Sequence, residues 1–384
     1  MANRKVTKKQ AKAAAKAISK APVWVIVTAL ILVALIVGGY FVYTKFFQKK
    51  SDPVPTPVPA VGEFSAHFLT LGNANSGDCV YIKAGENDIL IDGGSRTNSV
   101  DDIKSYVDTF VTDNKLEYVI VTHAHQDHIA CFAGDNTHNS LFDIYTCETI
   151  IDFPLHESTL AVYNRYITQR NEAVEEGAKH YTALDCYNNQ NGARRTYELA
   201  ESVSMEILYN YYYDHNTSDE NDYSVCVMFT HGDRDFLFTG DLGKYGEDKL
   251  AEMYSDRFRQ VELFKAGHHG SYTASNTKLL SKIQPKVCVV SCVAGNFEYA
   301  KKSNPSHTFP AQEFIDRIAK YTDKVYVTTL GSPENVSTYS DMNGIVVVSS
   351  GTDGVKVTCS NNDTLLKDTE WFKQNRTTPT EWAA

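Results

Sequence analysis

His123-Ala124-His125-Gln126-Asp127-His128 is the stretch that decides the fold of this chain. It follows the apolar run Tyr118-Val119-Ile120-Val121 with Thr122 between them, which predicts a turn at the carboxyl end of a β-strand. Imidazole nitrogens and carboxylate oxygens suit zinc, iron or manganese, and four such side chains within six residues exceed what packing requires. The stretch therefore predicts a metal site.

The spacing divides these four side chains into two pairs. His123 and His125 are two residues apart and are expected to point the same way, whereas Asp127 and His128 begin the next turn and face a neighbouring position. That arrangement suits two metals about 3.5–4 Å apart that share one hydroxide. The alternative, a cluster of surface histidines that binds nothing, is disfavoured by the density of metal-binding side chains.

The stretch also resembles, letter for letter, the HxHxDH signature of the metallo-β-lactamase superfamily. Over residues 62–350, further strings resemble in order and spacing the hydrolase-like domain of ComEC-type competence proteins. The resemblance implies a four-layer αββα sandwich, an α/β (α+β) fold, with ligands on loops at one edge. The strings are Phe68-Leu69-Thr70-Leu71-Gly72, Gly77-Asp78-Cys79-Val80-Tyr81-Ile82, Ile89-Leu90-Ile91-Asp92-Gly93-Gly94, Phe238-Thr239-Gly240-Asp241-Leu242 and Lys265-Ala266-Gly267-His268-His269-Gly270-Ser271.

The resemblance implies roles for Asp241 and for the pair His268 and His269. Asp241 would bridge the two metals, although taken alone it would also suit the N-cap of a following helix. One histidine of the pair would be the closing ligand and the other a donor to substrate or to a ligand, and the residues do not decide which. Both are candidate ligands, and His269 is also a candidate catalytic residue. Two functionless loop histidines are the alternative, which the flanking glycines disfavour.

A second role for Asp127 and three further side chains complete the predicted site. Asp127 would orient the attacking hydroxide as well as bind metal. His307 resembles a histidine that ComEC-type domains carry after their penultimate core strand, and would donate to a phosphoryl oxygen or to the leaving group; a lone loop histidine is equally compatible with no function. Asp78 and Asp92, each beside a glycine, are expected to shape the loops around the metals.

A third histidine for the first metal, which many members of the resembled superfamily have, does not stand out. The first metal would instead use Asp241 and water, which leaves a more open site. The candidates, none with a shared local pattern, are His138, His156, His180, His215 and His231.

The first 60 residues differ from the rest. Residues 23–43 carry no charge and are long enough to cross a bilayer as a helix. Seven basic residues precede them and three follow before residue 51, so the N-terminus is expected to stay in the cytoplasm. A cleaved signal peptide is disfavoured, because Tyr40-Phe41-Val42-Tyr43-Thr44-Lys45 stands where small residues would mark the cut.

These features predict five segments. Proline recurs at every second position from Pro53 to Pro59, which favours an extended stalk. Residues 155–222 match the family pattern least and are predicted to hold a family-specific insertion. The segments are a basic cytoplasmic tail (1–22), a transmembrane helix (23–43), a proline-rich stalk (44–61), an extracytoplasmic hydrolase domain (62–360) and a C-terminal tail (361–384).

Charge separates the classes of substrate. The chain has 37 Lys+Arg and 47 Asp+Glu; residues 1–50 hold ten basic and no acidic residues, which leaves 27 basic and 47 acidic residues, a formal charge of −20, in residues 51–384. Binding to nucleic acid is driven by counterion release at clustered Lys and Arg, so this balance disfavours it. Eight cysteines without a CxxC pair predict a core fixed by packing and metal.

Together these observations predict a single-pass, membrane-anchored, extracytoplasmic phosphoesterase or phosphodiesterase that uses two divalent ions, zinc or alternatively manganese. Its substrate would be a phosphoester of the cell envelope or the extracellular space. A ComEC-like extracellular nuclease and a catalytically silent envelope-binding module are the alternatives, and the intact motifs disfavour the second. The candidate ligands are His123, His125, Asp127, His128, Asp241, His268 and His269, and the candidate catalytic residues are Asp127, His269 and His307.

Overall fold

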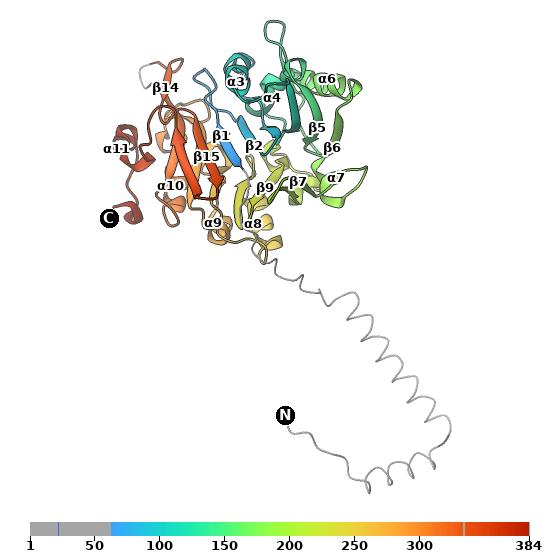
Figure 1. Cartoon of the computed structure of the whole chain (residues 1–384). Coiled ribbons are helices and arrows are strands. Elements are labelled where there is room, and N and C mark those ends of the chain that lie inside the picture. The colour runs from blue at the N-terminus through green and yellow to red at the C-terminus, as the bar shows by residue number, and fades with distance from the viewer. Residues whose placement is uncertain (1–21, 23–62, 333–334, 384) are drawn as a thin grey trace. The chain divides into compact units, whose positions relative to one another are not determined.

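The computed structural model describes residues 22, 63–332 and 335–383 (Figure 1). The expected cytoplasmic tail, transmembrane helix and stalk lie outside these residues, apart from Pro22. No helix within the described ranges has the length and apolar character needed to cross a membrane.

The first of two sheets has eight strands in the order β16-β15-β1-β2-β3-β4-β5-β6. β3 to β6 are parallel, and the remaining pairs are antiparallel. The strands are β1 (Phe64–Phe68), β2 (Val80–Ala84), β3 (Asn87–Ile91), β4 (Lys115–Ile120), β5 (Thr146–Asp152), β6 (Lys179–Thr182), β15 (Val346–Gly351) and β16 (Gly354–Cys359).

The second sheet also has eight strands, in the order β14-β13-β12-β11-β10-β9-β8-β7. β10 to β13 are parallel, and the outer pairs are antiparallel. The strands are β7 (Thr196–Ala200), β8 (Val203–Leu208), β9 (Cys226–His231), β10 (Arg234–Phe238), β11 (Leu263–Lys265), β12 (Val287–Ala294), β13 (Val325–Gly331) and β14 (Tyr339–Asp341).

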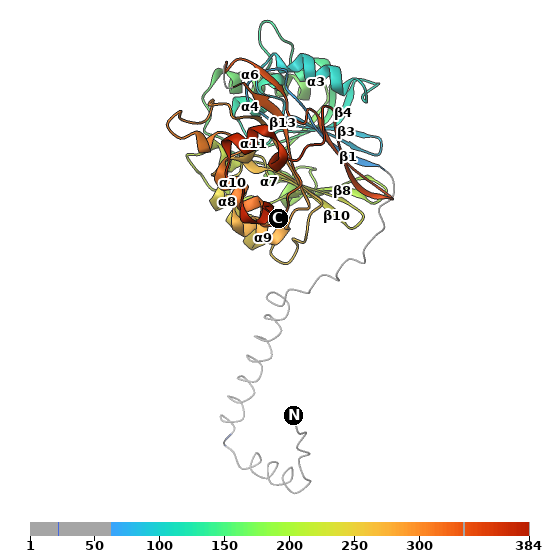
Figure 2. The same ribbon diagram turned by 90° about the vertical axis from the view of Figure 1, so that its left-hand side faces the viewer.

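Helices cover the outer faces of both sheets. Figure 2 shows α3, α4 and α6 on one side of the sheets and α8, α9 and α10 on the other. The helices are α3 (Ser99–Val107), α4 (Gln126–Ala133), α5 (Leu141–Ile144), α6 (Ala161–Glu175), α7 (Ala183–Asn188), α8 (Lys244–Met253), α9 (Thr277–Ile283), α10 (Gln312–Ile318) and α11 (Glu370–Asn375), with short 3-10 turns η1 (Tyr211–Tyr213), η2 (Glu220–Tyr223), η3 (Gly267–Gly270), η4 (Pro305–His307), η5 (Leu366–Asp368) and η6 (Thr380–Trp382).

Alternating side chains along the strands build two cores. In β10, Phe236 and Phe238 belong to the core between the sheets, while Leu237 faces the core under α8, α9 and α10. In β1, the ring of Phe64 lies 4.4 Å from that of Phe236, so aromatic side chains join the inner faces of the two sheets. The predicted pair of sheets covered by helices is therefore confirmed.

Two segments that the sequence set apart are part of this packing. Residues 155–222 supply β6 and β7, each at the edge of one sheet, together with β8. Residues 361–384, expected as a tail, place Leu366, Phe372 and Trp382 in the second core, where they are at most 5% exposed. The packed fold thus continues to residue 382.

Candidate metal centre

The predicted ligands follow the carboxyl ends of β4 in the first sheet and of β10 and β11 in the second. His123 and His125 follow β4, and His125 is the N-cap of α4, whose first turn carries Asp127 and His128. Asp241 follows β10. Asp241 is not the N-cap of the following helix, which was its alternative role, because the N-cap of α8 is Gly243.

His128 lies fully buried at the middle of the cluster. Its Nδ1 donates to Oδ2 of Asp92 over 2.8 Å, and its Nε2 lies 3.2 Å from Oδ2 of Asp241. Asp92 is held in turn by the backbone N–H of Thr122, 2.8 Å from its Oδ1, and by the Thr122 hydroxyl, 2.8 Å from its Oδ2. These hydrogen bonds fix the orientation of the His128 imidazole.

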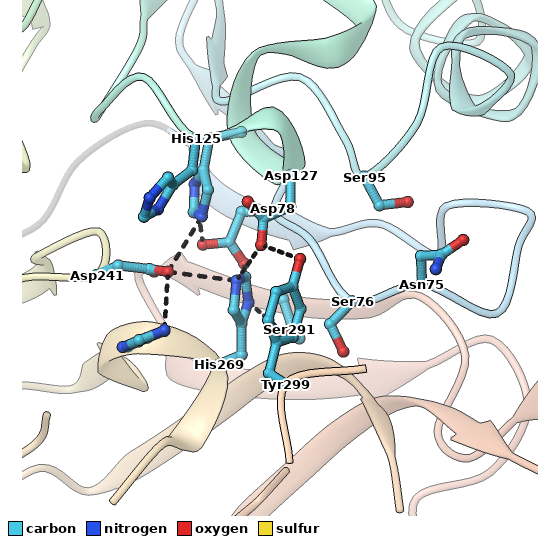
Figure 3. A network of polar contacts seen from close by, with 12 residues as sticks. Asn75, Ser76, Asp78, Ser95, His125, Asp127, Asp241, His269, Ser291 and Tyr299 are labelled. Carbon is cyan, nitrogen blue, oxygen red and sulfur yellow. Dashed lines mark hydrogen bonds and ion pairs between the residues drawn. The ribbon is translucent and has the colours of Figure 1, made fainter. Parts of the chain in front are cut away.

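His269 takes a defined orientation on the opposite side of the cluster. Its Nδ1 donates to the carbonyl oxygen of Ser291 over 2.9 Å, which turns Nε2 towards two carboxylates. Nε2 lies 3.3 Å from Oδ2 of Asp127 and 3.3 Å from Oδ2 of Asp241. Figure 3 shows these three side chains pointing towards one another.

The buried atoms that converge here fit a divalent cation. Nε2 of His269 and Oδ1 of Asp241 are buried without a hydrogen bond from the described residues. In two groups of three side chains, every ligand atom lies within 4.8 Å of the others: His123, His128 and Asp241 form one, and Asp127, His128 and His269 form the other. Imidazole nitrogens combined with carboxylate oxygens are a donor set that zinc and manganese accept.

The charge balance of the cluster also favours positive charge at its centre. Burial acts against the charged form of His128, but the carboxylates of Asp241 and Asp92 raise its pKa well above the ordinary value. Burial again opposes a charge on His269, yet Asp241 and Asp78 raise its pKa to about 10. Because these imidazoles attract protons so strongly, a metal ion that binds them must displace those protons.

His268 and His125 lie at the edge of the cluster, and neither occurs in the groups of three ligand atoms that the described residues form. The Nδ1 of His268 lies 3.0 Å from the Thr273 hydroxyl, and its Nε2 is 3.9 Å from Oδ2 of Asp241. The side chain is 20% exposed, in contrast to buried His269. The Nδ1 of His125 lies 3.1 Å from Nε2 of His123 and 3.0 Å from Oδ1 of Asn221.

The five candidates for a third histidine ligand do not join the cluster. None occurs in any of the ligand groups that the described residues form. Four of them form hydrogen bonds elsewhere: His138 with Asp135, His180 with Asp152, His215 with Asp214 and His231 with Ser350. The fifth, His156, packs against the ring of Tyr163.

Two contacts at the cluster involve residues that the sequence did not single out. Nζ of Lys265 lies 2.5 Å from Oδ2 of Asp78 in a fully buried ion pair. The hydroxyl of Tyr299 donates to Oδ2 of Asp127 over 2.9 Å (Figure 3). A charged residue at the end of the apolar strand β11 was the available signal for Lys265, whereas Tyr299 lies in a polar loop without any pattern.

A cleft of about 430 Å³ opens onto the cluster. His307 lies on its wall, where its ring stacks on Tyr272 with centroids 4.1 Å apart and its Nε2 lies 3.2 Å from Oε1 of Glu313. Ligand sites are commonly concave, so this is the place where a substrate would meet the metal centre. The lining residues include His125, Asp127, Asn221, Asp241, His268, Tyr272, Tyr299, His307 and Phe309.

Two helix-covered sheets with a histidine and carboxylate cluster at one edge define a metallo-β-lactamase-like fold with a site of the metal-dependent hydrolase class. Comparison with known proteins confirms this resemblance: residues 72–134 match the family model of the metallo-beta-lactamase superfamily.

Curated relatives confirm the ComEC-type resemblance at low identity. Recombination protein 2 of Haemophilus influenzae is 26% identical over 125 residues, which are 33% of this chain and 14% of that protein. ComE operon protein 3 of Bacillus subtilis is 23% identical over 214 residues, which are 56% of this chain and 24% of that protein. The chain thus spans less than a quarter of the length of these relatives.

Solved structures include similar chains with low identity. The metallo-beta-lactamase fold protein YhfI from Bacillus subtilis has a TM-score of 0.39 and 10% identity, and the match covers 72% of this chain and 99% of that chain. CmlA, a diiron beta-hydroxylase from Streptomyces venezuelae, has a TM-score of 0.40 and 11% identity, and the match covers 76% of this chain and 55% of that chain.

Proposed function

We propose that this chain is a metal-dependent phosphoesterase or phosphodiesterase that binds two divalent ions, zinc or manganese, and acts on a phosphoester of the cell envelope or the extracellular space. The observation that carries the proposal is the convergence of His128 and His269 on the carboxylates of Asp127 and Asp241 beneath an open cleft. Such a cluster at a loop edge of this fold suits hydrolysis.

The ligands divide between two subsites. Asp127, His128, Asp241 and His269 would hold one ion, and His123 and His125 would hold the other together with Asp241. When bound, such ions polarise the phosphoryl group and lower the pKa of a water molecule towards neutrality. The contacts of His128 with Asp92 and of His269 with the Ser291 carbonyl support this division, because each fixes the ring nitrogen that faces the centre.

The chain's own side chains would supply the remaining chemistry. The burial of His269 and the partial exposure of His268 support giving the ligand role to His269 and the proton-donating role to His268. Burial lowers the pKa of His268, and Asp241 acts in the opposite direction. His268 lines the cleft, so its Nε2 can act towards the leaving-group oxygen. Asp127 would orient the attacking water, and His307 would donate to a phosphoryl oxygen from the cleft wall.

A nuclease activity is the second candidate, because the relatives include a recombination protein and a ComE operon protein. Two observations oppose it. Residues 51–384 carry a formal charge of −20, and no Arg or Lys occurs among the described residues that line the cleft. A polyanion needs clustered cationic side chains to release its counterions, so a substrate with a single phosphate group is favoured.

Membrane anchoring through residues 23–43 remains part of the proposal.

The test combines metal content with turnover on the full-length chain. Two metals per chain by mass spectrometry, with hydrolysis of bis-p-nitrophenyl phosphate or p-nitrophenyl phosphorylcholine that chelation abolishes, is the expected result. His128→Ala should remove both metal and turnover, whereas the control His138→Ala should retain both. Unchanged turnover in His128→Ala would contradict the mechanism. A metal-free, inert chain, even after zinc or manganese is supplied, would favour the binding-module alternative.

A further inference from the structure

Tyr299 forms part of the cleft wall directly beside the metal centre. It lies in the connection between β12 and η4, and 48% of its surface is exposed. Its hydroxyl donates to Oδ2 of Asp127 over 2.9 Å, and its ring stacks on Phe309 with centroids 5.7 Å apart and an interplanar angle of 25°. A half-exposed aromatic ring on the cleft wall is thus held against Asp127, one of the candidate metal ligands.

The preceding residue, Glu298, anchors this connection to the other sheet. Its carboxylate accepts from the side-chain amide of Asn75 over 2.9 Å and from the backbone N–H of Ser76 over 3.0 Å, and it forms an ion pair with Arg96. Three donors on loops of the first sheet therefore hold a loop of the second. Because Glu298 is only 14% exposed, this anchor restrains the position of Tyr299.

The cleft next to Tyr299 suits a flat group without negative charge. Tyr272 and Phe309 are its other aromatic lining residues, and Arg and Lys are absent from the described residues that line it. Its volume of about 430 Å³ accommodates a ring in addition to a phosphate group. Aromatic rings recognise other rings by offset stacking, which a second phosphate group does not provide.

We infer that Tyr299 is a substrate-contacting specificity residue, which stacks on a flat substituent of the phosphoester that carries no negative charge, and that Glu298 is its positioning residue. The inference deepens the proposed function and rests on it for the reaction. The substrate class is then an aryl or heterocyclic phosphoester with one phosphate group.

The kinetic test uses two substrates with the same leaving group. Bis-p-nitrophenyl phosphate and methyl p-nitrophenyl phosphate both release p-nitrophenol, so the ratio of their kcat/KM values isolates recognition of the second substituent. In the full-length, metal-loaded chain, Tyr299→Leu should lower this preference about two- to tenfold, the range of one aromatic stacking contact. Tyr299→Phe, which keeps the ring, should preserve the preference. Glu298→Ala should lower it although Tyr299 is intact.

A binding measurement separates this inference from the proposed reaction. Calorimetry with phenylphosphonate and methylphosphonate needs no turnover, and the wild-type chain should favour the phenyl compound, with the preference lost in Tyr299→Leu. Tyr245→Leu is the matched control, since Tyr245 is 51% exposed and does not line the cleft. Hydrolysis with an unchanged aryl preference in Tyr299→Leu would overturn the inference and leave the function standing. Absent hydrolysis with a Tyr299-dependent phenyl preference would reject the function and support the aryl subsite.

Discussion

Nζ of Lys265 lies 2.5 Å from Oδ2 of Asp78 and 3.9 Å from Oδ1 of Asp241. Lys265 ends β11 in the second sheet, and Asp78 precedes β2 in the first, so this buried ion pair joins the two sheets behind the metal cluster. Oδ1 of the same Asp78 is 3.4 Å from Nδ1 of His269. The pair therefore links the packing of the sandwich to the orientation of a candidate ligand.

Removing one partner of this ion pair should destabilise the fold. Lys265→Met leaves the buried carboxylate of Asp78 without its lysine partner, which is expected to lower the free energy of unfolding by about 3–5 kcal/mol. Asp78→Asn in the same chain removes the unpaired charge and should restore part of the loss. Urea denaturation of the wild type, both single variants and the double variant measures the coupling. Additive effects of the two substitutions would show that the ion pair is not a stabilising unit.

Asp92 should set the metal affinity without being a ligand. Asp92→Asn places an amide donor where Oδ2 now accepts from His128, so the imidazole loses its orienting partner. We expect the metal dissociation constant to rise about 10- to 100-fold, measured by competition with a chelating dye. Asp135→Asn is the control, because Asp135 also accepts backbone N–H groups, from Thr137 and His138, but in a loop outside the site. A change below twofold in Asp92→Asn would refute the orienting role.

The local parts of the site could be predicted from the sequence, because each joins an apolar run to metal-binding side chains within a few residues. The 123–128 turn after β4 and Asp241 after β10 lie at the strand ends where this pattern places them. Residues that meet only through the tertiary fold leave no such pattern. Tyr299 and Asp127 are 172 positions apart, and nothing near either of them indicates the other.

Sparse apolar residues explain why the sequence does not mark residues 361–384 as part of the second core. Leu366, Phe372 and Trp382 are separated by polar residues and belong to short helices, so no periodic apolar face marks residues 361–384. Their burial depends on the second core, which strands and helices from distant parts of the chain assemble. The sequence likewise leaves open which of His268 and His269 is the metal ligand. That assignment rests on a tertiary contact, the hydrogen bond from Nδ1 of His269 to the Ser291 carbonyl.

The two adjacent histidines should separate in their effects. His269→Ala removes an imidazole whose Nε2 faces two carboxylates, so metal content should fall together with turnover. His268→Ala should retain metal and lower kcat about 10²- to 10⁴-fold, the range for loss of a general acid. Mass spectrometry of the purified chains and hydrolysis of bis-p-nitrophenyl phosphate give the two readouts. Loss of metal in His268→Ala with normal content in His269→Ala would reverse the assignment.

His67 should make the fold sensitive to acid independently of the metal centre. It is buried in β1, where its ring nitrogens bond the hydroxyls of Ser65 and Tyr106, and burial lowers its pKa from 6.5 to about 4. The unfolded chain therefore binds a proton that the folded chain rejects, so the stabilisation is complete above about pH 6.5 and is lost as pH falls towards 4, by up to about 3 kcal/mol. In urea denaturation at pH 7 and 4.5, His67→Gln should lose this part of the pH dependence of stability. The control His215→Gln, at an exposed loop position, should retain it. Parallel pH profiles for the wild type and His67→Gln would show that His67 does not titrate in this way.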